Sequence, residues 1–234
     1  MELLLGLTTT EHSNWQDKVR EIKELNIPKI SLFLTGLNLQ KRVELYQQLQ
    51  NVNVRIPVVH LRHDMTREEI NHLQKRFGTH MFNIHPGTYS IEWEGIRNLI
   101  YIENAGQRLV DNDLVGFAGL CIDFTHLEDE RRTYPNYYNQ LIRLSQKYKI
   151  GCGHVTAIGE NLGDQFDRNP LRYEKHFFEE LSEFDYLLRY KSILPNIICI
   201  EVENPFEQQL KVIDYIRNLL VSKRSEYHQS STLD

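Results

Sequence analysis

The sequence predicts an α/β protein whose parallel strands close into a (β/α)8, or TIM, barrel. Short apolar runs alternate with amphipathic stretches along the whole chain, and there are eight such runs. Strands that alternate with helices favour a parallel sheet, and a chain of 234 residues has the length of a single barrel domain. We therefore expect one domain over residues 1–222, followed by a polar, Ser-rich tail over residues 223–234.

The first half of the chain contains four expected strands, which are Leu3–Leu7, Lys29–Leu34, Arg55–Leu61 and Met81–Ile84. Apolar residues recur at helical spacing between them, and this predicts helices over Asn14–Leu25, over Leu39–Leu49 and from Thr66 through Phe77. Thr66 and Glu69 have the spacing of a capping box, which marks the start of the third helix.

The second half contains the other four expected strands, Leu99–Ile102, Gly119–Ile122, Ile150–His154 and Asn196–Ile200. Its expected helices are Tyr137–Lys147, Arg172–Tyr190 and Phe206–Val221. Only a turn or two of helix fits between His85 and Leu99, and again between Asn104 and Gly119, so the helices after the fourth and fifth strands should be shortened. The charged run at residues 128–132 is expected to form a solvated loop.

Composition and charge are those of an ordinary globular protein, with 41% hydrophobic residues, 25% charged residues and a net charge of −5. This net charge gives no overall attraction to a phosphate backbone, although bound divalent cations would add positive charge locally. Cys121, Cys152 and Cys199 lie inside apolar runs without CxxC spacing, which indicates buried thiols in a reducing compartment. Because no apolar stretch reaches the roughly 18 residues of a membrane span and the start lacks a leader pattern, we expect a cytoplasmic protein without membrane contact.

Metal-binding side chains follow the apolar runs at six successive strand ends. They are His60, His85, Glu103, Asp123 with His126, His154 and Glu201. The carboxyl ends of parallel barrel strands meet at one face, so these side chains should converge there and could share divalent ions. A carboxylate that directly follows a buried strand, as in Glu103 and Glu201, is costly to bury unless a partner or a cation neutralises it.

Each of these residues has a simpler interpretation when it is taken alone. Asp123 would cap the following helix while His126 faces solvent. His85 would belong only to a Pro–Gly turn, and His154 would be a structural histidine. The succession of strand ends favours the metal interpretation over these. The remaining histidines off the strand ends, for which we predict no role, are His12, His72, His80, His176 and His228.

Several short segments resemble the xylose-isomerase-like barrels, and most closely the endonuclease IV family of DNA endonucleases that act at abasic sites. The matching segments are NIHPG around His85, IENAGQ around Glu103, GLCIDFTH with Asp123 and His126, and IEVENP around Glu201. Asp-Arg-Asn at residues 167–169 stands in the loop where that family carries Asp-Arg-His. Together the segments extend from the third expected strand to the eighth.

The resemblance implies a cluster of up to three zinc ions, with manganese or magnesium as other candidates. His60 and His85 would hold one ion, and Glu103 would bridge it to a second ion completed by Asp123, His154 and Glu201. His126 and Asp167 would hold a third ion, where Asn169 replaces the histidine of the family. An amide oxygen is a poorer zinc ligand than imidazole, so this third site would be weak, empty or filled by another metal.

Three functions are compatible with this set of residues, and the sequence leaves the oligomeric state open. The first is metal-assisted hydrolysis of DNA at an abasic site, with Glu103 and Glu201 as the catalytic carboxylates. The second is isomerisation or epimerisation of a small sugar, in which the same two glutamates exchange protons beside a carbonyl and one ion suffices. The third is a non-catalytic barrel that keeps a structural metal site. Isomerisation needs one ion and does not require the additional ligands His60 and His85, so we favour hydrolysis.

Overall fold

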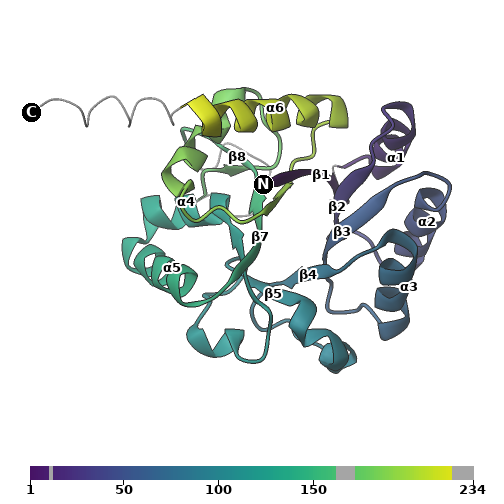
Figure 1. Ribbon diagram of the computed structural model, residues 1–234, viewed down its shortest axis with the longest axis horizontal. Helices are drawn as coiled ribbons and strands as arrows, with labels where there is room; N and C mark the ends of the chain where they lie inside the picture. Colours follow the sequence, from purple (N-terminus) through teal and green to yellow (C-terminus); the bar gives the residue numbers. More distant parts are fainter. Residues whose placement is uncertain (11–12, 162–171, 223–234) are drawn as a thin grey trace, which may run out of the picture.

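The predicted barrel is confirmed by a computed structural model that describes residues 1–10, 13–161 and 172–222. Eight strands form a closed parallel ring in the order β1-β10-β7-β6-β5-β4-β3-β2, with helices outside it (Figure 1). The strands are β1 (Glu2–Thr8), β2 (Lys29–Phe33), β3 (Arg55–His60), β4 (Met81–Ile84), β5 (Ile100–Glu103), β6 (Gly119–Asp123), β7 (Ile150–Val155) and β10 (Ile197–Ile200). The expected tail at 223–234 lies outside the described residues.

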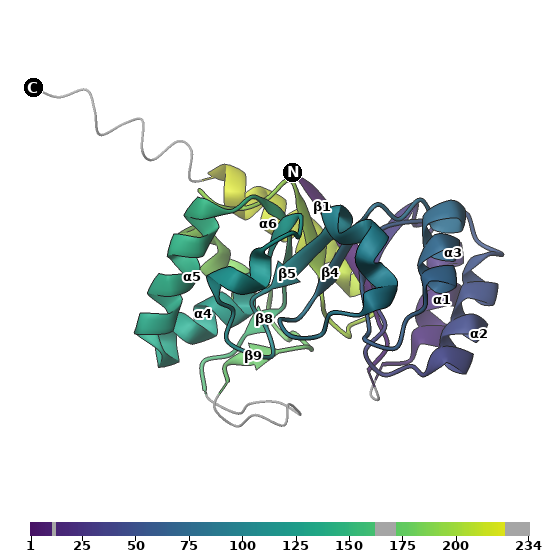
Figure 2. The same ribbon diagram turned by 90° about the horizontal axis from the view of Figure 1, so that it is seen from below.

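Five longer helices follow the sequence prediction closely. They are α1 (Trp15–Glu24), α2 (Leu39–Leu49), α3 (Arg67–Phe77), α5 (Pro135–Lys147) and α6 (Phe206–Ser222). The first three are capped by the residues that precede them, Asn14, Asn38 and Thr66, whose side chains accept a hydrogen bond from the backbone N–H three residues later. These three helices lie together on one side of the barrel (Figure 2). Within the described part of the chain, no helix combines the length and the apolar character needed to cross a membrane.

The helices after the fourth and fifth strands are shortened, as expected. They are the 3-10 segments η1 (Ile91–Leu99) and η2 (Asp111–Leu114). A third 3-10 segment, η3 (Leu181–Tyr190), replaces the second half of the helix predicted at Arg172–Tyr190, so that prediction was wrong. Its buried residues Phe184, Leu187 and Tyr190 recur every third position, which suits the three residues per turn of a 3-10 helix better than an α-helix.

The other half of that predicted helix forms part of a small sheet outside the barrel. β8 (Ala157–Ile158) pairs antiparallel with β9 (Glu174–Lys175), directly after the end of β7. This pairing turns Glu174 and the residues around it back toward the barrel mouth. Figure 2 shows both short strands at one end of the molecule.

The charged run at 128–132 is helical, so the loop prediction was also wrong. It lies within α4 (Phe124–Thr133), and Glu128 is buried there. Arg131 and Arg132 bind its carboxylate at 2.7–3.1 Å, and the Tyr190 hydroxyl donates to it at 2.8 Å. The ion pairs therefore neutralise a carboxylate that the sequence places in a continuous charged run.

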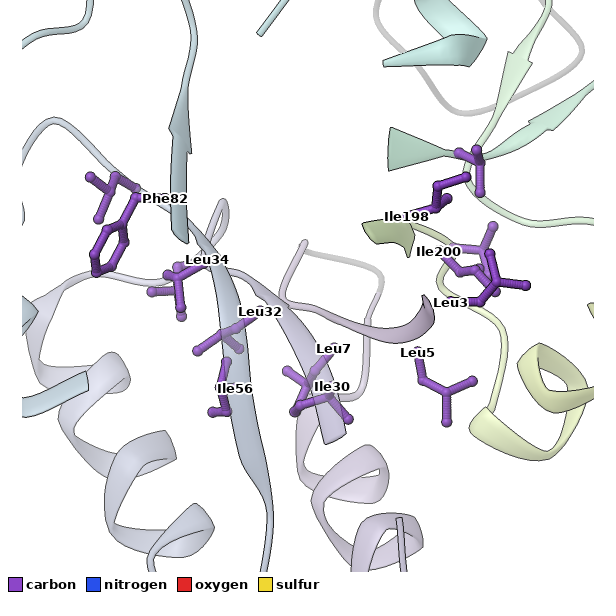
Figure 3. Packing of buried hydrophobic residues seen from close by; sticks show 14 of the residues in the cluster. Leu3, Leu5, Leu7, Ile30, Leu32, Leu34, Ile56, Phe82, Ile198 and Ile200 are labelled. Carbon is purple, nitrogen blue, oxygen red and sulfur yellow. The ribbon is translucent and has the colours of Figure 1, made fainter. Parts of the chain in front are cut away.

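Side chains of each barrel strand alternate between the helices outside and the barrel interior. Leu3, Leu5 and Leu7 pack with Ile30 and other residues of the main core, part of which is drawn in Figure 3. Leu4, between them, belongs to a separate cluster with Phe33, Val58 and Cys199, which fills the barrel interior. The three cysteines are fully buried and free, as predicted.

Candidate metal centre

The predicted ligands lie at the carboxyl end of the barrel because strand alternation turns them inward. Glu103, Asp123, His154 and Glu201 each follow, by two residues, a side chain that faces the interior: Tyr101, Cys121, Cys152 and Cys199. Register then sets them side by side, since Asp123 pairs with His154 across β6 and β7. The structure brings together seven of the eight residues predicted as ligands: His60, His85, Glu103, Asp123, His126, His154 and Glu201. The eighth, Asp167, lies outside the described residues.

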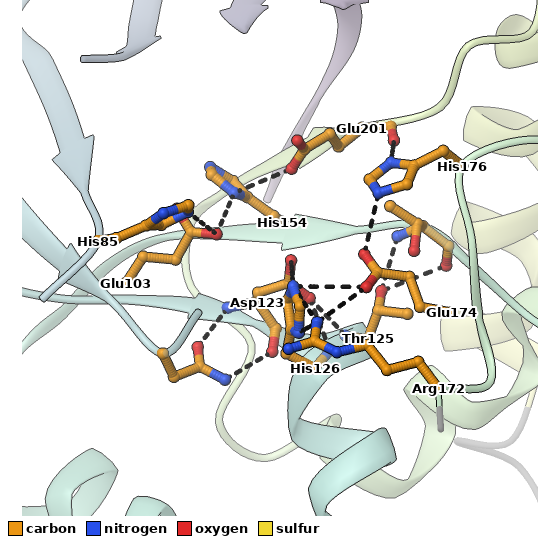
Figure 4. Close-up of polar contacts among 12 residues, drawn as sticks. His85, Glu103, Asp123, Thr125, His126, His154, Arg172, Glu174, His176 and Glu201 are labelled. Atoms are coloured by element: carbon orange, nitrogen blue, oxygen red, sulfur yellow. Dashed lines mark hydrogen bonds and ion pairs between the residues drawn. The ribbon is translucent and has the colours of Figure 1, made fainter. Parts of the chain in front are cut away.

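Four of these residues form what we call the inner cluster: Glu103, Asp123, His154 and Glu201. One ligand atom from each lies within 4.8 Å of the others. His154 Nδ1 is 3.3 Å from Glu103 Oε1 and 3.3 Å from Glu201 Oε2 (Figure 4). Two ligands about 2.1 Å from a tetrahedral zinc ion are about 3.4 Å apart, so these spacings suit ligands of one ion.

Glu103 connects the inner cluster to a histidine pair, His60 and His85. Its Oε2 lies 3.3 Å from His60 Nε2, whereas its Oε1 lies 4.0 Å from His85 Nε2 and faces His154. The Asn83 amide donates to Glu103 Oε2 at 2.6 Å and fixes this orientation. A carboxylate whose two oxygens face separate imidazoles is placed to bridge two ions. Asn83 was not identified from the sequence, although it precedes His85 by two positions on the inward face of β4.

Asp123 combines both of the roles that the sequence suggested for it. Its Oδ1 accepts from the backbone N–H groups of Thr125 at 2.8 Å and His126 at 2.9 Å, which caps α4. Its Oδ2 lies 3.7 Å from His126 Nε2, and its carboxylate also belongs to the inner cluster. Asn104 holds the Asp123 backbone with two hydrogen bonds of 2.7 and 3.0 Å. Burial raises the pKa of Asp123 to about 7, so the free carboxylate is poorly stabilised without a cation.

A second group, which we call the outer cluster, contains His126, Glu174 and His176. Glu174 Oε2 lies 3.5 Å from His126 Nε2, and Glu174 Oε1 lies 3.4 Å from His176 Nε2 (Figure 4). His176 Nδ1 is 3.3 Å from the backbone oxygen of Glu201, which ties this cluster to the inner one. The guanidinium of Arg172 lies 3.0 Å from His126 Nε2 and 3.2 Å from Glu174 Oε2.

Sequence reasoning missed two residues of the outer cluster. His176 was assigned no role, and Glu174 was placed inside a predicted helix. The signal that could have identified them is the Glu-Lys-His triplet at 174–176. It has an acidic residue two positions before a histidine, as in the Asp-Arg-His of the endonuclease IV family, and it lies seven residues after the Asp-Arg-Asn at 167–169. The antiparallel pair β8–β9 carries this triplet to the barrel mouth.

Electrostatics in the two clusters favour bound cations. Burial alone would lower the pKa of His154, but Glu103 and Glu201 raise it well above its ordinary value. Burial opposes ionisation of Glu174 in the same way, yet the neighbouring cations, His126 first, lower its pKa. In His176 the carboxylates, Glu174 first, outweigh burial and raise the pKa to about 9. In each cluster one carboxylate, Glu103 in the inner and Glu174 in the outer, is thus held as an anion beside imidazoles although burial opposes its charge.

The residues present fit divalent ions. His154 Nε2 is buried and makes no hydrogen bond to any residue that the structure describes, while His154 Nδ1 and Glu174 Oε1 have only ion-pair contacts of 3.3–3.4 Å. A buried polar atom left without a partner costs about 1–3 kcal/mol. Cations between these atoms would satisfy them, and the nitrogen and carboxylate donors are those that zinc, manganese and similar ions accept.

Comparisons with known proteins support the fold. No protein-family model matches the chain, and no curated protein matches it. Among solved structures it is similar to the probable 3-DHS dehydratase AsbF involved in petrobactin synthesis from Bacillus anthracis, with 14% identity and a TM-score of 0.51 over 95% of this chain and 100% of that one. It is also similar to a xylose isomerase-like TIM barrel protein from Mycobacterium smegmatis in complex with magnesium, with 14% identity and a TM-score of 0.50 over 94% and 96%. The chain therefore shares the TIM-barrel fold of these two proteins.

Proposed function

We propose that the protein is a hydrolase of phosphodiesters that uses several divalent metal ions, and that it cleaves DNA at abasic sites. The observation that supports this most is the number and grouping of the donors. The donors form overlapping groups at one barrel mouth. Glu103 groups both with the inner cluster and with the histidine pair, and Asp123 of the inner cluster lies within 4.8 Å of His126 and Glu174 of the outer cluster. A single ion needs only the inner cluster, whereas a phosphate with attacking and leaving oxygens is served by neighbouring ions.

The ligand assignment follows the groups described above. His60, His85 and Glu103 would hold one ion, and Glu103, Asp123, His154 and Glu201 a second. Glu174 and His176 would join His126 at the third ion, in the places that the sequence had suggested for Asp167 and Asn169. With an imidazole in place of the amide, the third site has the donors that zinc favours. When bound, the ions would lower the pKa of a coordinated water and offset the charge of the phosphate.

Three side chains at the barrel mouth would orient the metal ligands and contact the substrate. Glu103 is almost fully buried, and Asn83 holds its carboxylate in one orientation. Glu201 is more open, with 17% of its side chain exposed, and so can face the reacting groups. The Arg172 guanidinium, 23% exposed beside the outer cluster, is a donor suited to a phosphate oxygen. Free buried thiols also fit the reducing cytoplasm that we propose as the location.

Cleavage of a DNA duplex that carries a tetrahydrofuran abasic analogue tests the proposal directly. Protein supplied with zinc or manganese should cut the strand at the analogue and leave an undamaged duplex intact. Glu201→Gln serves as the control, because it removes an inner-cluster charge while nearly preserving side-chain volume. Cleavage that does not exceed this control would remove the proposed activity.

One observation favours a second candidate, a metal-dependent isomerase or epimerase of small sugars. The inner cluster is complete without the other two groups, and its glutamates Glu103 and Glu201 flank the same imidazole nitrogen. Such carboxylates could move protons beside a carbonyl held by one ion. Fold neighbours that include a dehydratase and a magnesium-bound barrel are compatible with chemistry of this class. Solvent deuterium incorporated into ketoses or aldoses would favour this candidate, and none across a broad panel would exclude it.

A further inference from the structure

Three thiols line the barrel interior one layer beneath the inner cluster. Cys121, Cys152 and Cys199 come from the neighbouring strands β6, β7 and β10. Register pairs Cys121 with Cys152, and Cys199 with His154. Each thiol is fully buried and free, and each precedes an inner-cluster residue by two positions. A layer of thiol side chains, whose sulfur atoms are soft and polarisable, therefore lies directly beneath the inner cluster.

One of these thiols reaches the cluster itself. Cys121 Sγ, a carboxylate oxygen of Glu103 and a ring nitrogen of His154 all lie within 4.8 Å of one another. Three atoms at such separations can surround an ion at about 2.8 Å or less, and small shifts would bring them to the zinc–ligand distances of about 2.0–2.3 Å. His154 is completely buried, and its ring nitrogens make no hydrogen bond within the described parts of the chain. The imidazole beside the thiol therefore has carboxylate contacts at Nδ1 and, within the described residues, no hydrogen-bond partner at Nε2.

We propose that the metal centre has a deeper, thiolate-bearing position, in which Cys121, Glu103 and His154 bind a thiophilic divalent cation such as zinc or cadmium. One sulfur, one nitrogen and one oxygen donor form a set that zinc and cadmium accept, whereas magnesium prefers oxygen and water ligands. The ion would enter from the mouth, where 39% of the His85 side chain is exposed, and pass between the inner-cluster residues. This position does not depend on which reaction the centre performs.

Cadmium is a suitable probe, because a cadmium–thiolate bond gives an ultraviolet charge-transfer band. The full chain, stripped of metal with a chelator, is titrated with Cd²⁺ and the band is recorded. We expect the band in the wild type and its loss in Cys121→Ser, which removes the sulfur at little change in volume. Cys199→Ser is the matched control, since Cys199 is equally buried but outside the donor group, and it should keep the band. Mg²⁺ should produce no band, and excess Zn²⁺ should abolish it by competition.

A second variant decides the matter even if Cys121→Ser does not fold. In the double variant Cys152→Ser/Cys199→Ser, Cys121 is the only thiol left in the chain. A Cd²⁺ band in this folded variant, as judged by circular dichroism, supports the deeper position. A wild type without a band, a band unchanged in folded Cys121→Ser, or a folded double variant without one overturns it. The band reports binding rather than turnover, so this result is separate from the outcome of the cleavage assay.

Discussion

The inner and outer clusters share one barrel mouth but are built in different ways. The inner cluster consists of strand ends whose positions follow from register and alternation, so its residues are fixed by the barrel itself. The outer cluster takes His126 from the first turn of α4 and Glu174 and His176 from the small sheet outside the barrel. The inner cluster needs only the closed barrel sheet, whereas the outer cluster also needs the β8–β9 pair that follows β7. We therefore expect the two clusters to respond separately to mutation.

Replacing Glu103 should have the largest effect, because it connects the inner cluster to the histidine pair. Glu103→Gln removes the charge that faces both His60 and His154. Since even an outer-shell partner contributes about 10–100-fold to metal affinity, we expect a loss of at least about 100-fold in zinc affinity and in activity. Isothermal titration of the metal-free protein measures it. Glu203→Gln, a neighbouring carboxylate bound to Thr10, is the control and should stay near wild type.

Loss of the outer cluster should remove one ion and leave the inner cluster intact. Glu174→Gln weakens the contacts with both His126 and His176, and His176→Ala removes the imidazole that the sequence did not suggest. Metal analysis should find about one ion fewer per chain in either variant, with inner-cluster affinity preserved. His80→Ala, an exposed histidine, is the matched control. Equal loss of all ions would show that the clusters are not separate.

A smaller effect is expected from Asn83, which touches the inner cluster without belonging to it. Asn83→Ala removes the 2.6 Å hydrogen bond to Glu103 Oε2. We expect metal affinity to fall by about 10–100-fold, with the number of bound ions unchanged at saturation. The same change at the exposed Asn53 should have no effect. An unchanged affinity in Asn83→Ala would mean that strand geometry alone orients Glu103.

The smallest expected effect is the pH dependence of stability in the metal-free protein. Burial raises the pKa of Asp123 from 3.8 to about 7, and the carboxylates raise that of His176 from 6.5 to about 9 against burial. In both cases the folded state binds protons more tightly than the unfolded state. The stability that these two groups contribute is therefore lost as pH rises, between about pH 4 and 7 for Asp123 and between about 6.5 and 9 for His176.

Thermal unfolding in chelator measures this dependence. Other groups titrate in the same range, so the comparison between variants isolates His176. The melting temperature of the wild type should fall relative to that of His176→Ala between about pH 6.5 and pH 9. A difference between the two proteins that stays constant or grows in favour of the wild type over this range would contradict the assignment.

The sequence predicted the inner cluster and the barrel for the same reason. Alternation and strand ends are local patterns, so Glu103, Asp123, His154 and Glu201 could be found before their neighbours were known. Asn83 could not, because its role depends on which strand lies beside β4. Glu174 and His176 depend on a pairing between residues 157–158 and 174–175, which no local pattern indicated. The error at Arg172–Tyr190 arose because apolar spacing of three was interpreted as α-helical.

A count of bound metal decides whether one barrel mouth holds ions at both clusters. Protein purified without chelators can be analysed by elemental mass spectrometry and by anomalous scattering from crystals. We expect at least two ions per chain, with one beside His154 and another between His126 and Glu174. A single ion confined to the inner cluster, or none at all, would contradict it.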